Sequence, residues 1–293
     1  MPDPLPTRII ALMKPNPLNI GNPTPEELFS PMEVYHENSK LGSTNEELFQ
    51  KIATVNSSPH IRRVISRPFR SYPGCPCVEL TKKFEPMTRS LEHLLTHRRS
   101  HHHFSGEPAR LDDLARVLLL GDGIVSRMTS EDGAEFLLRT APSGGGLYPI
   151  ETFCITFQVE GLAPGAYFYN AQKHRLEQLA AEDFRPRLAD ATNLKAEVEG
   201  ASFCIALSAV LPRSSFKYGQ RAYRFVLLEA GHIAQNVLLT AESLGLGALP
   251  VGGFFDDDLN AVFRLDGCQE FVVYLMLVGN KAHAASAETK HQP

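Results

Sequence analysis

One long segment, residues 221–246, constrains the fold of this chain more than any other feature. It reads RAYRFVLLEAGHIAQNVLLTAESLGL, and its apolar residues fall almost all the way round a helix. A helix of this kind has to be covered on several sides. The segment therefore predicts a long helix at the centre of a globular domain. No run in the sequence approaches 18 apolar residues, so no membrane-spanning helix is expected.

Helix and strand patterns surround this segment without a strict alternation of strand and helix. Amphipathic patterns predict helices at residues 90–95, with Leu91, Leu94 and Leu95 on a shared buried face, and further along the chain at 110–124 and 256–265. Apolar, β-branched and aromatic runs predict strands at residues 151–159, 165–171, 174–179, 201–211, 248–254 and 270–279. This mixture predicts an α+β fold.

The composition and periodicity of the sequence suggest how the chain divides into parts. Residues 1–86 are rich in Pro, Asn and Ser and are interpreted as an N-terminal extension or pre-domain. Periodic patterns dominate from residue 87 to 281, which predicts one folded domain. Residues 282–293 are expected to form a disordered tail.

Composition excludes several classes of protein. The chain has 293 residues, of which 43% are apolar and 21% charged, as in ordinary globular proteins. Its net charge of −4 argues against nucleic acid as a partner. Five cysteines are an odd number and argue against a secreted disulfide framework, and the N-terminus lacks a signal-peptide core. A cytoplasmic protein is expected.

A basic cluster follows the predicted helix at residues 90–95. It consists of Arg98, Arg99 and Ser100, followed by three histidines at 101–103. Two guanidinium groups and a hydroxyl suit a phosphate, although a solvated basic helix end would have the same composition. Adjacent histidines point in different directions and no second ligand cluster follows, so no metal site is expected.

Two glycine turns form further candidates. The first is PSGGGLYP at residues 142–149, where exposed backbone would admit a flat ligand or a phosphate. The second is PVGGF at residues 250–254, at the end of a predicted strand. Neither has the surroundings of a P-loop or a dinucleotide fingerprint. Simple turns with positive φ would explain both equally well.

A lysine–tyrosine pair precedes the long helix. Lys217 and Tyr218 would form a proton-transfer pair if they were held close together and partly buried, and would otherwise be surface residues. Glu229 and His232 lie one turn apart within the helix. They are interpreted as core or interface polar groups rather than as catalysts.

These motifs occur in a fixed order: RRS, PSGGGLYP, KYGxR, EAGHIAQN, PVGGF and a terminal LVGN. This order resembles the flavin-dependent nitroreductase-like superfamily, and more closely its SagB-type azoline dehydrogenases. The segments YHENSK (35–40) and RPFRSYPGCPCVEL (67–80) resemble the pre-domain of that subfamily. The resemblance implies an α+β fold with a mixed central sheet flanked by helices, and a homodimer that holds FMN at the subunit interface.

Residue roles follow from the resemblance, motif by motif. It implies that FMN is bound by residues of four segments, namely Arg98, Arg99, Ser100, His102; Pro142, Ser143, Gly144, Gly145; Val251, Gly252, Gly253; and Lys281. In azoline dehydrogenases a Lys-Tyr pair at this position is associated with catalysis. We hypothesise that Tyr218 acts as the base and that Lys217 lowers its pKa.

The implied activity is the oxidation of peptide azolines, either thiazolines or oxazolines, to aromatic azoles in natural-product biosynthesis. The hydride would pass to FMN and the proton to a protein base, with oxygen as the final electron acceptor. A cyclodehydratase or a peptide substrate would be the partner. Two alternatives stay open. One is a stand-alone NAD(P)H-dependent nitro- or quinone reductase, and the other is a flavin-poor scaffold subunit of a peptide-modifying complex.

Overall fold

The structure is a computed structural model that describes residues 30–42, 45–66 and 69–282. The chain divides into two compact units, residues 1–46 and 47–293. In the first unit, helix α2 (Pro31–Asn38) begins with a capping box in which Ser30 and Glu33 each accept a backbone N–H of the other. Apart from Ala282, the tail predicted to be disordered lies outside the described residues.

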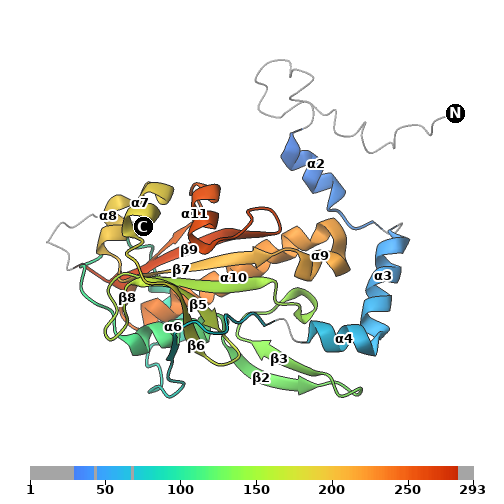
Figure 1. Ribbon diagram of the computed structural model, residues 1–293, viewed down its shortest axis with the longest axis horizontal. Helices are drawn as coiled ribbons and strands as arrows, with labels where there is room; N and C mark the ends of the chain where they lie inside the picture. The colour runs from blue at the N-terminus through green and yellow to red at the C-terminus, as the bar shows by residue number, and fades with distance from the viewer. Residues whose placement is uncertain (1–29, 43–44, 67–68, 283–293) are drawn as a thin grey trace, which may run out of the picture. The chain divides into compact units, whose positions relative to one another are not determined.

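Seven strands form the sheet of the second unit, in the order β1-β6-β5-β4-β7-β9-β8 (Figure 1). Their bounds are β1 Cys77–Glu79, β4 Ile150–Thr156, β5 Gly165–Asn170, β6 Arg175–Ala180, β7 Phe203–Val210, β8 Leu246–Val251 and β9 Glu270–Asn280. Every ladder between these seven strands is antiparallel, so the expectation of a mixed sheet is wrong. The chain returns through short turns from β4 to β5 to β6, and such turns join antiparallel neighbours only. Edge strand β1 lies within residues 1–86, the stretch interpreted above as an N-terminal extension.

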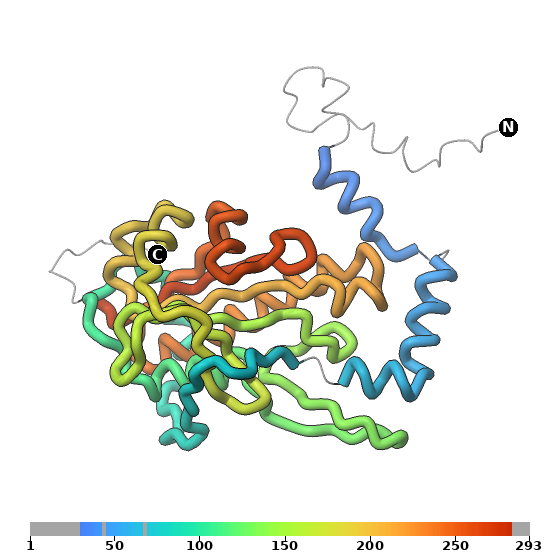
Figure 2. Tube along the Cα trace, viewed as in Figure 1, coloured from blue at the N-terminus to red at the C-terminus, as the bar shows by residue number. Residues whose placement is uncertain are grey.

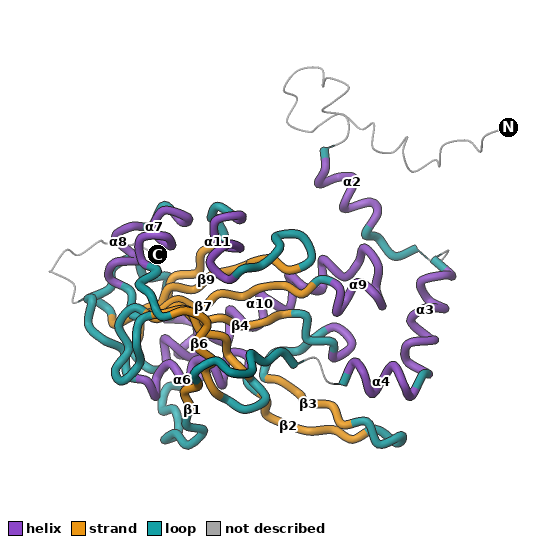
Figure 3. Tube along the Cα trace, viewed as in Figure 1, coloured by secondary structure: helices purple, strands orange, loops and turns teal. Residues whose placement is uncertain are grey.

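Helices cover both faces of the sheet, as Figure 3 shows. One face packs against α6 (Leu111–Asp122) and α10 (Ala222–Ser243), and the other against α7 (Arg185–Thr192), α8 (Lys195–Gly200) and α11 (Asp256–Phe263). Alternate residues of β7 enter the two resulting cores, which explains why its sequence is apolar at every position except Ser208. The predicted α+β fold and the long central helix, now α10, are confirmed. Among the described residues, no helix is long and apolar enough to cross a membrane.

Helix α5 (Leu91–His97) departs from its predicted packing. Leu94 is buried, but Leu91 and Leu95 are 64% and 56% exposed. The expectation that all three share a buried face is therefore wrong for the single chain. The physical reason is that α5 packs only its Leu94 side against the rest of the chain, and leaves the flanking leucines in solvent.

One end of the second unit gathers several short helices and a hairpin. They are α3 (Glu46–Ser57), α4 (Pro59–Ile65), the hairpin of β2 (Ile124–Thr129) and β3 (Glu135–Arg139), and α9 (Pro212–Tyr218). Arg62 of α4 forms an ion pair with Asp132 in the hairpin turn, Nη2···Oδ2 2.9 Å. Figure 2 shows α4 and the hairpin at the same end as α9. This end also carries the glycine loop at residues 144–146.

Candidate active site

The arginine-serine motif lies beside β8. Ser100 forms a parallel bridge with Ala248, and the His101 N–H donates to the Ala248 carbonyl, N···O 3.1 Å. Strand β8 then runs on into the turn at residues 251–253. At about 3.3 Å per residue along a strand, the motif and this turn lie roughly 10–15 Å apart. The structure thus brings together two motifs that stand about 150 residues apart in the sequence.

Basic side chains gather around the carboxylate of Glu242 at the C-terminal end of α10. Lys281 Nζ lies 2.9 Å from Oε2, Arg89 Nη1 lies 3.3 Å from Oε1 and His101 Nε2 lies 3.9 Å from Oε2. Burial lowers the pKa of His101, and the charges of Lys281 and Arg98 lower it further against the opposing effect of Glu242. We call Arg89, Arg98, His101 and Lys281 the cation cluster. With one carboxylate among three permanent cations, it carries net positive charge.

Arg98 is the member of this cluster that has an unsatisfied atom. Its Nη1 is buried without a hydrogen-bond partner in the described part of the chain. A buried donor of this kind costs free energy unless an acceptor reaches it. The neighbouring Arg99 is different, because its Nη1 donates to the carbonyls of Thr96 and Arg98, both at 2.9 Å. The structure therefore distinguishes the two arginines that the sequence treats as equivalent.

His102 lies apart from the cation cluster. Its Nδ1 is 3.2 Å from Glu197 Oε1 of α8, whereas His101 faces Glu242. Successive side chains of an extended segment point to opposite sides. The sequence could have indicated this alternation, but not which of the two histidines faces the cluster. Arg89 and Glu242 carry no motif and were not predicted.

The first glycine loop and the Lys-Tyr pair lie against each other. Gly145 has φ +69°, and a Cβ at this position would collide with Tyr218 Oη and lie 3.0 Å from Lys217 Nζ. Gly144 in turn faces Phe225 of α10, and a Cβ added there would lie 3.4 Å from the ring. Only a glycine at residue 145 allows both the left-handed backbone and the two side chains above it. The glycine loop at residues 144–146 and the pair Lys217 and Tyr218 therefore form one site.

Burial governs the ionisation of the pair. Lys217 is only 4% exposed, and its Nζ lies 5.1 Å from the centre of the Tyr218 ring. Burial lowers the pKa of Lys217 and raises the pKa of Tyr218. Both shifts favour the neutral forms, an amine and a phenol. The shift of Tyr218 is opposite to the lowering that our tyrosine-base hypothesis requires.

Glu229 lies behind the same loop. Its side chain is buried, its Oε1 accepts the Ile150 N–H at 3.4 Å, and its Oε2 has no partner within the described residues. Burial raises its pKa to about 8, while a hydrogen bond from Ser143 partly opposes the shift. Ser143 also accepts the Tyr148 N–H at 2.9 Å. Glu229 thus supports the glycine loop from inside, whereas His232, one turn further on, is exposed.

The two groups of candidate residues stand at opposite ends of α10. Phe225, which faces the glycine loop, and Glu242, which lies in the cation cluster, are about 25 Å apart along the helix axis at 1.5 Å per residue. A ligand that touches both groups in one chain would have to span the central helix. Within a single chain, each group therefore provides only part of a ligand-binding site.

FMN, which the resemblance implies, combines a phosphate, a hydroxylated chain and a planar ring system. The cation cluster with its unpaired Arg98 Nη1 suits a phosphate. The two glycine turns suit a planar ring, since Gly253 has only open space where a Cβ would stand and Gly145 lies against the Lys-Tyr pair. The residues present therefore fit FMN, although the glycine loop at residues 144–146 and the cation cluster of one chain are too far apart to contact a single FMN molecule together.

Comparisons with known proteins place the chain in a family. Residues 95–280 match the model of the nitroreductase family. A Methanocaldococcus jannaschii protein provisionally named a nitroreductase is 33% identical over 65% of this chain and 91% of its own length. The microcin B17-processing protein McbC of Escherichia coli is 29% identical over 49% of this chain and 54% of its own length, so the chain spans about half of that relative.

Solved structures show the same fold. A provisionally named nitroreductase from Anabaena variabilis superposes with a TM-score of 0.65 at 26% identity, covering 84% of this chain and 45% of that one. A chain of the Escherichia coli microcin synthetase McbBCD complex with truncated pro-MccB17 bound gives a TM-score of 0.54 at 20% identity, covering 87% and 98%. The match to the family model covers more than half of the sequence and includes every motif of the site, and on this evidence the chain belongs to the nitroreductase family.

Proposed function

We propose that this chain is an FMN-dependent dehydrogenase that oxidises azoline rings of a peptide to aromatic azoles. Members of the nitroreductase family commonly bind FMN, and one relative is a peptide-processing protein whose microcin synthetase complex has been solved with a truncated pro-peptide bound. The observation that carries the proposal is the position of Lys217 and Tyr218 directly over Gly145. A simple flavin reductase needs no such pair, because the flavin itself carries the electrons.

The buried pair supplies what azoline oxidation requires of the protein. The ring loses two hydrogens, one as a hydride and one as a proton. When bound, FMN supplies the hydride acceptor. The proton needs a base within hydrogen-bond reach of the ring carbon. Because burial favours a neutral amine and a neutral phenol, we assign the proton acceptor to Lys217 Nζ and assign a hydrogen-bonding, orienting role to Tyr218. The assignment revises our sequence-based hypothesis, in which Tyr218 was the base.

A homodimer would complete the cofactor site. The cation cluster of one chain and the glycine loop of a second chain could approach one FMN, which the 25 Å separation within a chain does not allow. An exposed stripe on α10 supports such pairing: Tyr223, Leu227 and Leu228 are exposed, and Gly231 has open space around its missing Cβ. Leu91 and Leu95 of α5 add further uncovered apolar surface. Exposed apolar patches of this kind mark interaction sites.

The test begins with the visible spectrum of the purified protein. FMN released on denaturation would establish the cofactor. The holoenzyme is then mixed anaerobically with NADPH and, separately, with a synthetic peptide that contains one thiazoline. We expect the peptide to bleach the flavin and to lose two hydrogens, as measured by mass spectrometry, and we expect slow bleaching by NADPH.

The Lys-Tyr pair is tested in the same assay. Lys217→Met should slow flavin bleaching by the peptide about 10²–10⁴-fold, the usual contribution of a general base. Tyr218→Phe should cost less, because it removes an orienting hydrogen bond. Lys195→Met, an exposed lysine of α8, is the matched control. Full activity in Lys217→Met with normal FMN content would refute the role of the pair.

A stand-alone reductase is the second candidate function. The match of the Methanocaldococcus jannaschii protein over 91% of its length favours it, since that protein is provisionally named a nitroreductase. Fast bleaching by NADPH together with inertness toward the thiazoline peptide would select it. A protein that neither contains nor binds FMN would favour the third candidate, a scaffold subunit.

A further inference from the structure

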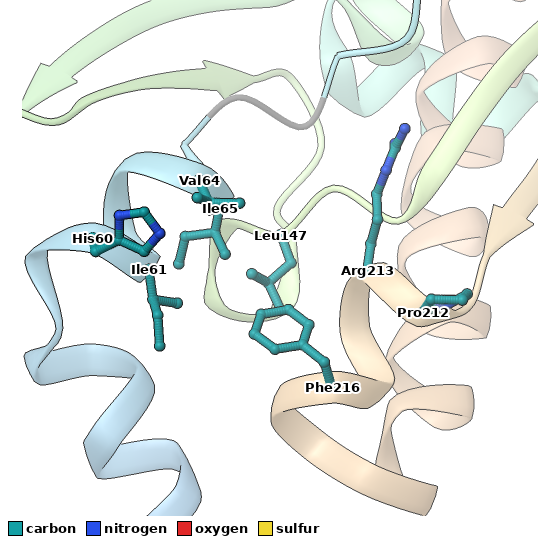
Figure 4. Close-up of a pocket in the computed structure, with 8 residues that line it drawn as sticks. All are labelled: His60, Ile61, Val64, Ile65, Leu147, Pro212, Arg213 and Phe216. Atoms are coloured by element: carbon teal, nitrogen blue, oxygen red, sulfur yellow. The ribbon is translucent and has the colours of Figure 1, made fainter.

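A cavity of about 590 Å³ lies beside the Lys-Tyr pair, between α4, the glycine loop and α9 (Figure 4). Apolar side chains dominate its lining. Helix α4 contributes Ile61, Val64 and Ile65, the loop contributes Leu147, and α9 contributes Phe216 together with Pro212. His60 and Arg213 complete the lining. The volume falls in the range of small-molecule and side-chain binding sites.

Helix α4 turns an apolar face toward the cavity, and the described residues cover this face only in part. Its lining residues are spaced i, i+3 and i+4 and so share one face. None of the residues of α4 is buried, and Val64 is 61% exposed. Arg62 of the same helix forms an ion pair with Asp132 in the hairpin turn. An anchored helix that turns its apolar face toward a cavity indicates an apolar occupant.

Charge complementarity narrows the choice of occupant. Arg213 is the charged residue of the lining, but its guanidinium forms an ion pair with Glu151 and donates to the Tyr148 carbonyl. Figure 4 shows the Arg213 side chain extending away from the cluster of apolar side chains. Among the described residues that line the cavity, no unpaired lysine, arginine or carboxylate faces it. An uncharged group therefore fits, and an acidic or basic group would lose its hydration without gaining an ionic partner.

The cavity adjoins the site of the proposed chemistry. Phe216 immediately precedes Lys217, and Leu147 follows Gly145 by two residues. An extended peptide advances about 3.3–3.6 Å per residue. A ring that reaches Lys217 would therefore place a neighbouring residue, one to three positions away, within reach of the cavity.

We propose that this cavity is a specificity pocket that receives a large, uncharged apolar side chain of the peptide substrate, next to the ring that is oxidised. The proposal rests on the proposed function and extends it from a substrate class to a sequence preference. It also gives α4, within the predicted N-terminal extension, a direct part in substrate recognition.

The test uses the FMN-loaded full chain and synthetic peptides with one thiazoline. Phe, Ala or Asp is placed at each of the three positions on either side of the ring. At one position we expect Phe to raise kcat/KM over Ala by about ten-fold or more, as burial of a large apolar side chain predicts, and Asp to lower it. The absence of a preference for Phe at all six positions would overturn the pocket and leave the proposed function standing.

Two variants of Val64 locate the preference. Val64→Trp fills the cavity and should reverse the ratio, so that Ala exceeds Phe. Val64→Asp places a charge in it and should bring the ratio close to one. Both variants should fold, because Val64 is exposed. Val34→Asp makes the same change at an exposed valine of α2, in the other compact unit, and should keep the ratio of the native protein. An unchanged ratio in Val64→Trp would refute the assignment.

The two proposals can fail separately. If no thiazoline peptide is oxidised, the proposed function is wrong, and binding alone decides the pocket. The corresponding thiazole peptides are then titrated by calorimetry. The Phe peptide should bind about ten-fold more tightly than the Ala peptide, and Val64→Trp should abolish the difference. Equal binding of the two peptides by the native protein would refute the pocket.

Discussion

Replacing Glu229 with Gln should change how the stability of this protein depends on pH. Glu229 is 3% exposed, its Oε2 has no hydrogen-bond partner in the described residues, and burial raises its pKa to about 8 from an ordinary value of 4.5. Between these two pH values the folded chain holds a proton on Glu229 that the unfolded chain has released. The free energy of unfolding therefore falls as the pH rises through this window.

The size of the effect follows from the two pKa values. Each pH unit in the window costs about 1.4 kcal/mol. Between pH 5.5 and 7.5, with partial titration at both ends, the native protein should lose about 2–3 kcal/mol relative to Glu229→Gln, which has no proton to release. A constant offset between the two proteins is also expected, since the Gln amide is a buried donor that needs an acceptor.

Urea unfolding followed by far-ultraviolet circular dichroism measures this difference, as the chain has no tryptophan. The native protein and Glu229→Gln are compared at pH 5.5, 6.5 and 7.5 under identical buffer and protein concentration. Glu131→Gln, at an exposed position in the β2–β3 turn, is the matched control. A difference between native and Glu229→Gln that does not change with pH would refute the reasoning, because Glu229 would then be ionised or solvated in the folded state.

Three further predictions concern the cofactor site and the dimer. Arg98→Ala should weaken FMN binding about ten-fold or more, measured by flavin fluorescence, because Nη1 of Arg98 lacks a partner among the described residues, whereas Arg99→Ala should have a smaller effect; equal losses would contradict the distinction. Gly145→Ala should destabilise the protein by about 1–3 kcal/mol in urea unfolding, because the new Cβ collides with Tyr218 and the backbone has φ +69°. A variant as stable as the native protein would contradict this close contact. Gly231→Trp should convert a dimer into monomers in light scattering while far-ultraviolet circular dichroism stays native, since the space there is open in one chain; an unchanged dimer would place the interface elsewhere.

The sequence patterns were sufficient to predict the α+β class and the long central helix, but not how the strands pair. The periodicity of residues 221–246 predicted α10, and the largely apolar run at 201–211 predicted a strand, which the structure covers on both faces. Both patterns arise from burial, which acts on every residue of an element and is therefore visible in the sequence. The antiparallel character of the sheet was not visible, because it depends on which strands become neighbours.

The site depended on contacts between distant segments. From the sequence, Lys217 and Tyr218 were equally compatible with a surface position, and Glu229 with an ordinary core position. The fold brings all three to the loop around Gly145, and the burial that results moves their pKa values in directions that no local pattern predicts. The sequence also could not show that His101, rather than His102, lies in the cation cluster. Which side of an extended segment faces the cluster depends on where the rest of the chain places the cluster.

The sequence by itself thus determined the main strands of the sheet, the long central helix and the residue types available for chemistry. Tertiary structure alone decided their grouping, namely an arginine with an unpaired donor, among the described residues, at one end of α10 and a lysine–tyrosine pair, with Lys217 buried, at the other. It also decided that α4, which bears no motif, faces a cavity beside that pair. Local patterns follow from the hydrophobic effect along one chain segment, whereas desolvation, charge interactions and cavity shape depend on which segments meet in space.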